Sequence, residues 1–79
     1  MALEINYPIN SQLVKCKLTV DSILGSGANA AAYAEIVEKD SGKFIAGRLF
    51  EFNAQTENDF NSAYEHIKTA PDFADATDV

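Results

Sequence analysis

The side chains that most often do chemistry in proteins are scarce in this chain. His66 is the only histidine and Cys16 the only cysteine. Acid–base catalysis by His66 needs a partner within hydrogen-bonding reach, and its neighbour Glu65 points elsewhere if both residues are helical. Cys16 alternates with apolar residues, which favours a packing role for its thiol. Neither residue indicates an active site, so we expect no enzymatic activity.

Metal and cofactor sites have equally little support. A zinc site needs four ligands, taken mostly from Cys and His, and the chain offers one of each. Asp72, Asp75 and Asp78 lack the alternate spacing, central glycine and closing glutamate of a calcium-binding loop. The glycines at 25 and 27 are not followed by the Lys-Ser/Thr pair of a phosphate loop. We therefore expect no metal, no cofactor and no small-molecule substrate.

Length and charge restrict the remaining function classes. A chain of 79 residues allows one domain, residues 1–79, with a thin core. Its net charge of −6 argues against a nucleic-acid partner, because Lys and Arg must neutralise phosphates. The N-terminus lacks the basic residues and apolar run of a signal peptide, and no apolar stretch approaches the ~20 residues of a membrane span. We expect cytoplasmic synthesis and no membrane contact.

The first half of the chain carries the alternation of antiparallel strands. Residues 3–9 alternate apolar with polar side chains, and Asn10-Ser11 supplies turn chemistry. In residues 14–21 the apolar side chains again fall on one face and the polar ones on the other, as in a half-buried strand. The small residues at 25–29 break this pattern and predict a mobile connection.

The middle segment leaves one question open and then predicts a hairpin. Alanines in residues 28–38 suit a helix, but the turn signal Asp40-Ser41-Gly42 that follows favours a strand. Residues 43–53 are expected to form the return strand. Strict alternation gives it two apolar faces: Phe44, Ala46, Arg48, Phe50 and Phe52 on one, and Ile45, Gly47, Leu49 and Glu51 on the other. We expect a helix on the first face, and either a curl of the sheet or a second chain on the other.

The C-terminal third predicts one amphipathic helix. Thr56 has the chemistry of an N-cap, with Asp59 completing a capping box. The apolar stripe Phe60, Ala63, Tyr64 and Ile67 follows at helical spacing. Pro71 ends the helix, and residues 72–79 are expected to form an acidic, flexible tail from which Phe73 folds back on the core. The predicted fold is therefore α+β, an antiparallel sheet of about four strands with this helix packed on a face.

Four residues are candidates for a protein–protein interface. Ile45 and Leu49 are predicted to lie on the sheet face opposite the helix, beside Tyr33 of the neighbouring strand. Exposed apolar side chains grouped in this way mark contact sites, and Tyr33 and Arg48 are of the types that anchor interfaces. The alternative is that the sheet curls and buries both faces within one chain.

The C-terminal sequence AYEHIKTAPDFADATDV resembles small proteins encoded among the structural genes of tailed bacteriophages. The pattern falls on Ala63, Tyr64, Lys68, Thr69, Pro71, Phe73, Ala74 and Asp78. The resemblance implies a virion or tail-associated protein without catalysis. The expected function is a non-enzymatic structural or assembly protein of the tail, baseplate or connector, located in the virion and contacting other virion proteins or itself. The alternative is a small acidic phage inhibitor of a host enzyme or defence complex, whose charge competes for a basic groove.

Overall fold

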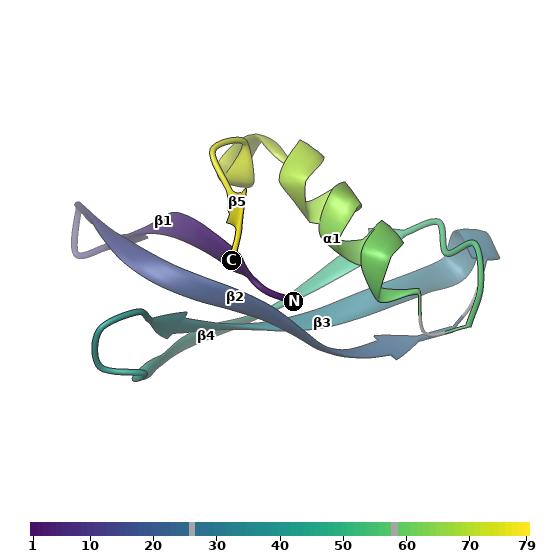
Figure 1. The fold of residues 1–79 in the computed structure, drawn as a ribbon, viewed down its shortest axis with the longest axis horizontal. Helices are drawn as coiled ribbons and strands as arrows, with labels where there is room; N and C mark the ends of the chain where they lie inside the picture. Colours follow the sequence, from purple (N-terminus) through teal and green to yellow (C-terminus); the bar gives the residue numbers. More distant parts are fainter. Residues whose placement is uncertain (26, 58) are drawn as a thin grey trace.

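The computed structural model describes residues 1–25, 27–57 and 59–79 and shows an α+β fold (Figure 1). The elements are β1 (Leu3–Ile9), β2 (Gln12–Leu24), η1 (Gly27–Asn29), β3 (Ala30–Glu38), β4 (Phe44–Phe52), α1 (Phe60–Thr69), η2 (Pro71–Phe73) and β5 (Thr77–Asp78). The strands form one antiparallel sheet in the order β4-β3-β2-β1-β5. The predicted class, with one C-terminal helix, is confirmed. The sheet has five strands where about four were expected.

The β1–β2 hairpin follows directly from its sequence. Ile9 pairs with Gln12, so the turn consists of Asn10 and Ser11, with φ angles of 49° and 67°. Two residues in the left-handed region give the turn type whose twist matches that of paired strands. The predicted apolar face of this hairpin is buried; its fully enclosed side chains are Leu3, Ile5, Cys16 and Leu18.

The segment left open between helix and strand is β3. Three of its alanines, Ala30, Ala32 and Ala34, are almost completely buried on the face that α1 covers. Small side chains there let the helix lie close to the sheet. At the end of β3, Gly42 has φ of 73° and donates its N–H to the Glu38 carbonyl at 2.8 Å, closing the predicted turn. Of the connection expected at residues 25–29, Ser26 lies outside the described residues.

The helix α1 begins later than predicted. Its N-cap is Asp59, not Thr56, because the Asp59 carboxylate accepts hydrogen bonds from the backbone N–H of Ser62 at 3.1 Å and of Gln55 at 2.8 Å. One carboxylate thus satisfies a free N–H of the first helical turn and fixes the chain that enters it. The predicted end of the helix, just before Pro71, is confirmed.

We expect Asp59→Ala to lower the melting temperature of the protein, since it removes the N-cap side chain of α1. The hydrogen bonds from Ser62, followed by that from Gln55, lower the pKa of Asp59 from 3.8. The stability that Asp59 contributes is therefore fully present when the pH is above the pKa of this group in the unfolded chain. It is lost as the pH falls through the lower pKa of the folded protein. Thermal unfolding at neutral and strongly acidic pH, with Asp59→Asn as control, measures this. Equal melting temperatures of Asp59→Ala and the unsubstituted protein at neutral pH would contradict a stabilising role of Asp59 as N-cap.

Tyr64 ties α1 to the place where β1 and β2 separate. Leu3 pairs with Leu18, so the same register would bring Met1 opposite Val20. The Tyr64 hydroxyl lies between them, accepting the Val20 N–H at 2.8 Å and donating to the Met1 carbonyl at 2.9 Å. A side chain of the helix thus forms hydrogen bonds with two main-chain groups of neighbouring chain segments that do not pair with each other.

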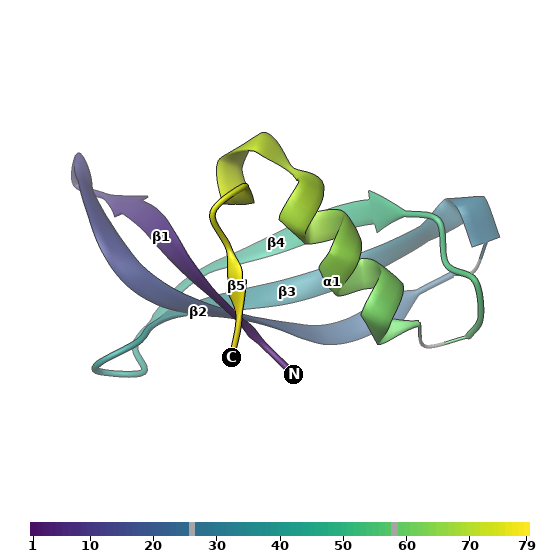
Figure 2. The ribbon, with the colours of Figure 1, turned by 45° about the horizontal axis from the view of Figure 1, so that its top comes forward.

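The C-terminal segment lies on the sheet, where the sequence predicted a flexible tail from residue 72. Phe73 is 1% exposed and contacts Phe50 edge to face, with ring centroids 5.7 Å apart. The short strand β5 then pairs with Leu3 and Glu4 of β1. Figures 1 and 2 show α1 on one side of the curled sheet and the chain after it returning to β5, beside β1. The expected return of Phe73 to the core is confirmed.

Candidate protein-contact surface

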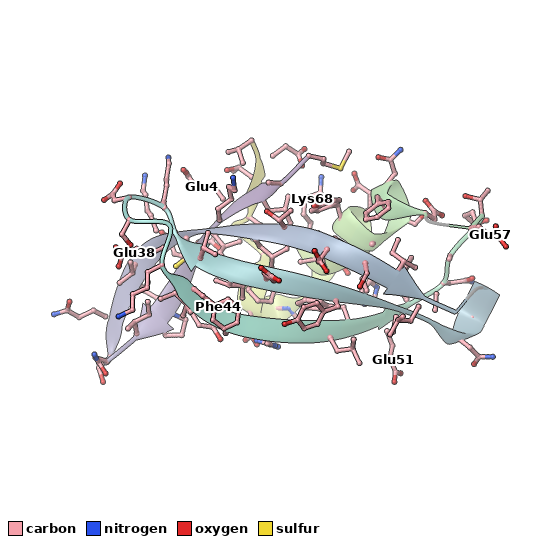
Figure 3. The ribbon with its side chains drawn as sticks, turned by 90° about the horizontal axis from the view of Figure 1, so that it is seen from below. Glu4, Glu38, Phe44, Glu51, Glu57 and Lys68 are labelled. Carbon is pink, nitrogen blue, oxygen red and sulfur yellow. The ribbon has the colours of Figure 1, made fainter. Side chains whose placement is uncertain are left out.

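The side of the sheet opposite α1 is uncovered (Figure 1). Its centre is formed by β3 and β4, with the end of β2 beside them. We use the term open face for the six residues on this side whose positions matter below: Leu24, Tyr33, Val37, Phe44, Gly47 and Leu49. Figure 3 views the molecule from this direction, with Phe44 and Glu51 labelled on β4.

The open face exposes large apolar side chains. Leu24, Phe44 and Leu49 are 60%, 55% and 59% exposed. They come from different parts of the sheet and share one side of it, where polar neighbours such as Thr19 and Glu35 separate them. Apolar groups gathered on one surface, with polar groups between and around them, are typical of a protein contact site.

Tyr33 and Leu49 form the middle of the open face. They are cross-strand partners, and the Tyr33 ring also extends over Gly47. A Cβ added at Gly47 would lie 2.9 Å from two carbon atoms of that ring. The glycine therefore leaves the space that the ring occupies, and an aromatic side chain covers the bare backbone.

Of the four predicted interface residues, the structure brings Tyr33 and Leu49 together on the open face. Ile45 is not there, because the register shifts: Ile36 pairs with Ala46 but Val37 pairs with Phe44. Ile45 is thus an extra residue of a β-bulge. At the N-terminal end of β4, the faces are therefore the reverse of those that strict alternation predicts. Ile45 packs against the core and Phe44 is exposed. The prediction that Phe44 joins Phe50 and Phe52 under the helix was wrong.

Arg48 lies on the opposite side from the open face. Its guanidinium carbon is 5.5 Å from the ring centroids of both Phe50 and Phe73, so it covers the two aromatic rings where the C-terminal segment meets β4. It also lines a groove of about 330 Å³ together with Tyr7 and Asp72. This position gives Arg48 a packing role by cation–π contact.

Leu24 and Phe44 were not predicted to be surface residues. Each is separated from the regular part of its strand by a register shift: Leu24 comes after the shift between Val20 and Ser22, and Phe44 comes just before the bulge at Ile45. A bulge inverts the alternation of faces between the two parts of a strand that it separates. Strict alternation in the sequence could not reveal either shift.

The two side chains singled out for chemistry, Cys16 and His66, lie in different surroundings. Burial raises the pKa of the Cys16 thiol, which is fully enclosed and hence protonated at neutral pH. His66 is exposed on α1. Within the described ranges, no three His, Cys, Asp or Glu side chains are grouped so that they could hold a metal ion.

A hollow of about 440 Å³ lies beside the N-terminus and is lined partly by Glu4 and Lys39. Glu4 is hydrogen-bonded to Lys39, which lowers the pKa of the carboxyl and raises that of the amine. Lys15 lies 4.0 Å from the same carboxylate. The Glu4 carboxylate in this hollow is therefore paired with lysine side chains and is not a free acid.

Comparison with protein families, curated proteins and solved structures finds no match to this chain. In the part of the chain that the structure describes, no helix combines the length and apolar character needed to cross a lipid bilayer.

Proposed function

We propose that this chain is a non-enzymatic phage structural or assembly protein that acts by protein–protein contact. The observation that carries the contact role is the open face, where Leu24, Phe44 and Leu49 are each more than half exposed. Burying such side chains against a partner is favourable by about 25 cal/mol per Å² of apolar surface. The tail, baseplate or connector setting is supported by the C-terminal resemblance, and the partners are other virion proteins or further copies of this chain.

The alternative, a small acidic inhibitor of a host enzyme or defence complex, is supported by the net charge of −6. The two functions differ in their response to salt. A contact made by acidic groups with a basic groove weakens as salt screens the charges, whereas an apolar contact persists. Recovery of the protein with purified virions in high salt favours the structural role, and loss of a host partner on raising salt favours the inhibitor.

We expect Leu49→Lys to fold normally and to be depleted from virions. Leu49 is 59% exposed on the open face, so a lysine there remains solvated in the monomer and changes the free energy of unfolding by only about 0.5 kcal/mol or less. In a docked complex the charge would be buried at a cost of several kcal/mol. Mass spectrometry of purified particles, together with thermal unfolding of the isolated protein, measures both effects.

Leu13→Lys is the matched control. Leu13 is 73% exposed, but it lies at the tip of the β1–β2 hairpin, away from the open face. We expect it to leave incorporation unchanged. Equal incorporation of Leu49→Lys and the unsubstituted protein would contradict docking through the open face.

A further inference from the structure

The two edges of the sheet differ. At one edge, β1 is covered by the two-residue strand β5. At the other edge lies β4, nine residues long, which pairs with β3 on one side only. An edge strand of this length offers a row of main-chain donors and acceptors to another strand.

The main-chain groups of β4 that point outward can be assigned from the hydrogen bonds at the end of β3. Glu38 donates its N–H to Lys43, toward β4, whereas Lys39 donates to Lys15, toward β2. Main-chain groups alternate in direction along a strand, so the even-numbered residues of β3 face β4. Their partners on β4 include Arg48, opposite Ala34, and Phe50, opposite Ala32.

It follows that Gly47, Leu49 and Glu51 direct their N–H and C=O groups away from β3. Each of them has one donor and one acceptor, which gives three donors and three acceptors along one short stretch of the edge. This stretch lies beyond the bulge at Ile45 and is regular in its pairing with β3. It is therefore suited to a complete antiparallel ladder with a second strand.

We propose that a second copy of this chain pairs with β4 antiparallel, about a two-fold axis that passes at Leu49. The proposal rests on the contact function proposed above and names the partner. In this register Leu49 lies opposite Leu49 of the second copy, and Gly47 lies opposite Glu51 of the second copy. The three outward residues of each strand then satisfy one another, and the two sheets become one continuous sheet.

Side chains favour this register over its neighbours. An axis at Arg48 would place two guanidinium groups directly opposite each other, which is destabilising. An axis at Phe50 would place Leu49 opposite a carboxylate. With the axis at Leu49, two leucines meet on the open face, and Arg48 lies opposite Phe50 of the second copy. Arg48 already covers aromatic rings within its own chain, so the new neighbour is of the same kind.

The acidic charge of the chain is compatible with this pairing. The two Glu51 side chains would lie four residues apart along the ladder, roughly 13 Å, beyond the screening length of about 8 Å in physiological salt. Each would lie opposite Gly47, over which the Tyr33 hydroxyl extends. A carboxylate would thus approach a hydroxyl donor at the one position of the strand that has no side chain.

Cysteine cross-linking tests the register. Residues opposite each other in such a hydrogen-bonded pair have Cα atoms about 5.5 Å apart, within the range that a disulfide spans. We expect Leu49→Cys to form a covalent dimer under mild oxidation, seen on a non-reducing gel. Glu51→Cys is the matched control. It should give no covalent dimer on the same gel, because the two cysteines at position 51 lie too far apart to form a disulfide. The native Cys16 is fully buried and does not compete.

Main-chain pairing is tested separately by Leu49→Pro. The Leu49 N–H points away from β3, so proline at this edge position preserves the native ladder and removes only the outward donor. We expect a normal circular dichroism spectrum and a rise of about tenfold or more in the dimer dissociation constant by sedimentation. Leu24→Lys, which alters the open face but not the β4 edge, should leave dimerisation unchanged. Added salt should strengthen dimerisation, because both copies are acidic.

The proposal is overturned if the unsubstituted protein stays monomeric at all concentrations, if Leu49→Cys and Glu51→Cys cross-link equally or not at all, or if a folded Leu49→Pro protein dimerises as tightly as the parent. None of these outcomes bears on docking to other virion proteins, which is tested separately by the incorporation of Leu24→Lys into particles, because Leu24 lies on the open face but in β2, away from the β4 edge. Conversely, a chain that dimerises through β4 but is never found in particles would refute the structural role and leave the pairing intact.

Discussion

Phe73→Ala is expected to lower the free energy of unfolding by about 3–5 kcal/mol, the usual cost of truncating a buried phenylalanine. The ring is 1% exposed and packs on Phe50. Its removal would leave a cavity under η2 that the short segment cannot close without losing the β5 pairing. Arg48 would also lose one of the two rings that it covers.

This loss is large for so small a domain. Stability of about 0.05–0.15 kcal/mol per residue corresponds to roughly 4–12 kcal/mol for the whole chain. We therefore expect Phe73→Ala to be partly or fully unfolded at 37 °C, as measured by urea titration followed by circular dichroism. Phe44→Ala is the matched control: its ring is 55% exposed, and the change should be within about 0.5 kcal/mol. Similar losses in the two variants would show that Phe73 is not part of the core.

Tyr64→Phe is expected to cost about 1–3 kcal/mol, although it removes a single oxygen atom. The Tyr64 hydroxyl satisfies the Val20 N–H and the Met1 carbonyl at once. Without it, the Val20 N–H loses its acceptor, because the ladder between β1 and β2 begins only at Leu3 and Leu18. The apolar packing of the ring stays, so the whole effect measures the two hydrogen bonds.

Hydrogen exchange of the Val20 amide provides a local readout of the same change. We expect its protection to fall in Tyr64→Phe by more than that of amides elsewhere in β2. The control is Tyr33→Phe, on the open face, which should leave global stability within about 0.5 kcal/mol. Unchanged exchange at Val20 would mean that another group accepts this N–H in solution.

Periodicity in the sequence was sufficient for most of the fold. The alternation around Cys16 correctly predicted which side of its strand is buried. Of the predicted helical stripe, Ala63, Tyr64 and Ile67 are buried, whereas Phe60 is 36% exposed. The turns at Asn10-Ser11 and Gly42 were predicted from residue types common in turns, and all three residues have positive φ angles. Such features depend on neighbours in the sequence and are readable from it.

The features that were missed depend on distant partners. The bulge at Ile45 is visible only as a mismatch between β3 and β4, and it decides that Phe44, not Ile45, is exposed. Strand β5 is two residues long, too short for any periodic signal, and forms because Phe73 anchors the segment before it. The N-cap is Asp59 and not the predicted Thr56, and its carboxylate also accepts the Gln55 N–H. Of the four surface candidates, Tyr33 and Leu49 therefore lie on the open face, and Ile45 and Arg48 do not.

The position of the chain ends has a consequence for anything attached to them. The Val79 N–H donates to the Ala2 carbonyl at 3.0 Å, and Figures 1 and 2 show the two termini close together. Both belong to the edge formed by β1 and β5, at the far side of the sheet from β4. A tag, a label or a neighbouring domain joined at either end would leave the β4 edge unobstructed. In a pair joined through β4, all such attachments would project from the two opposite ends of one ten-stranded sheet, five strands from each copy.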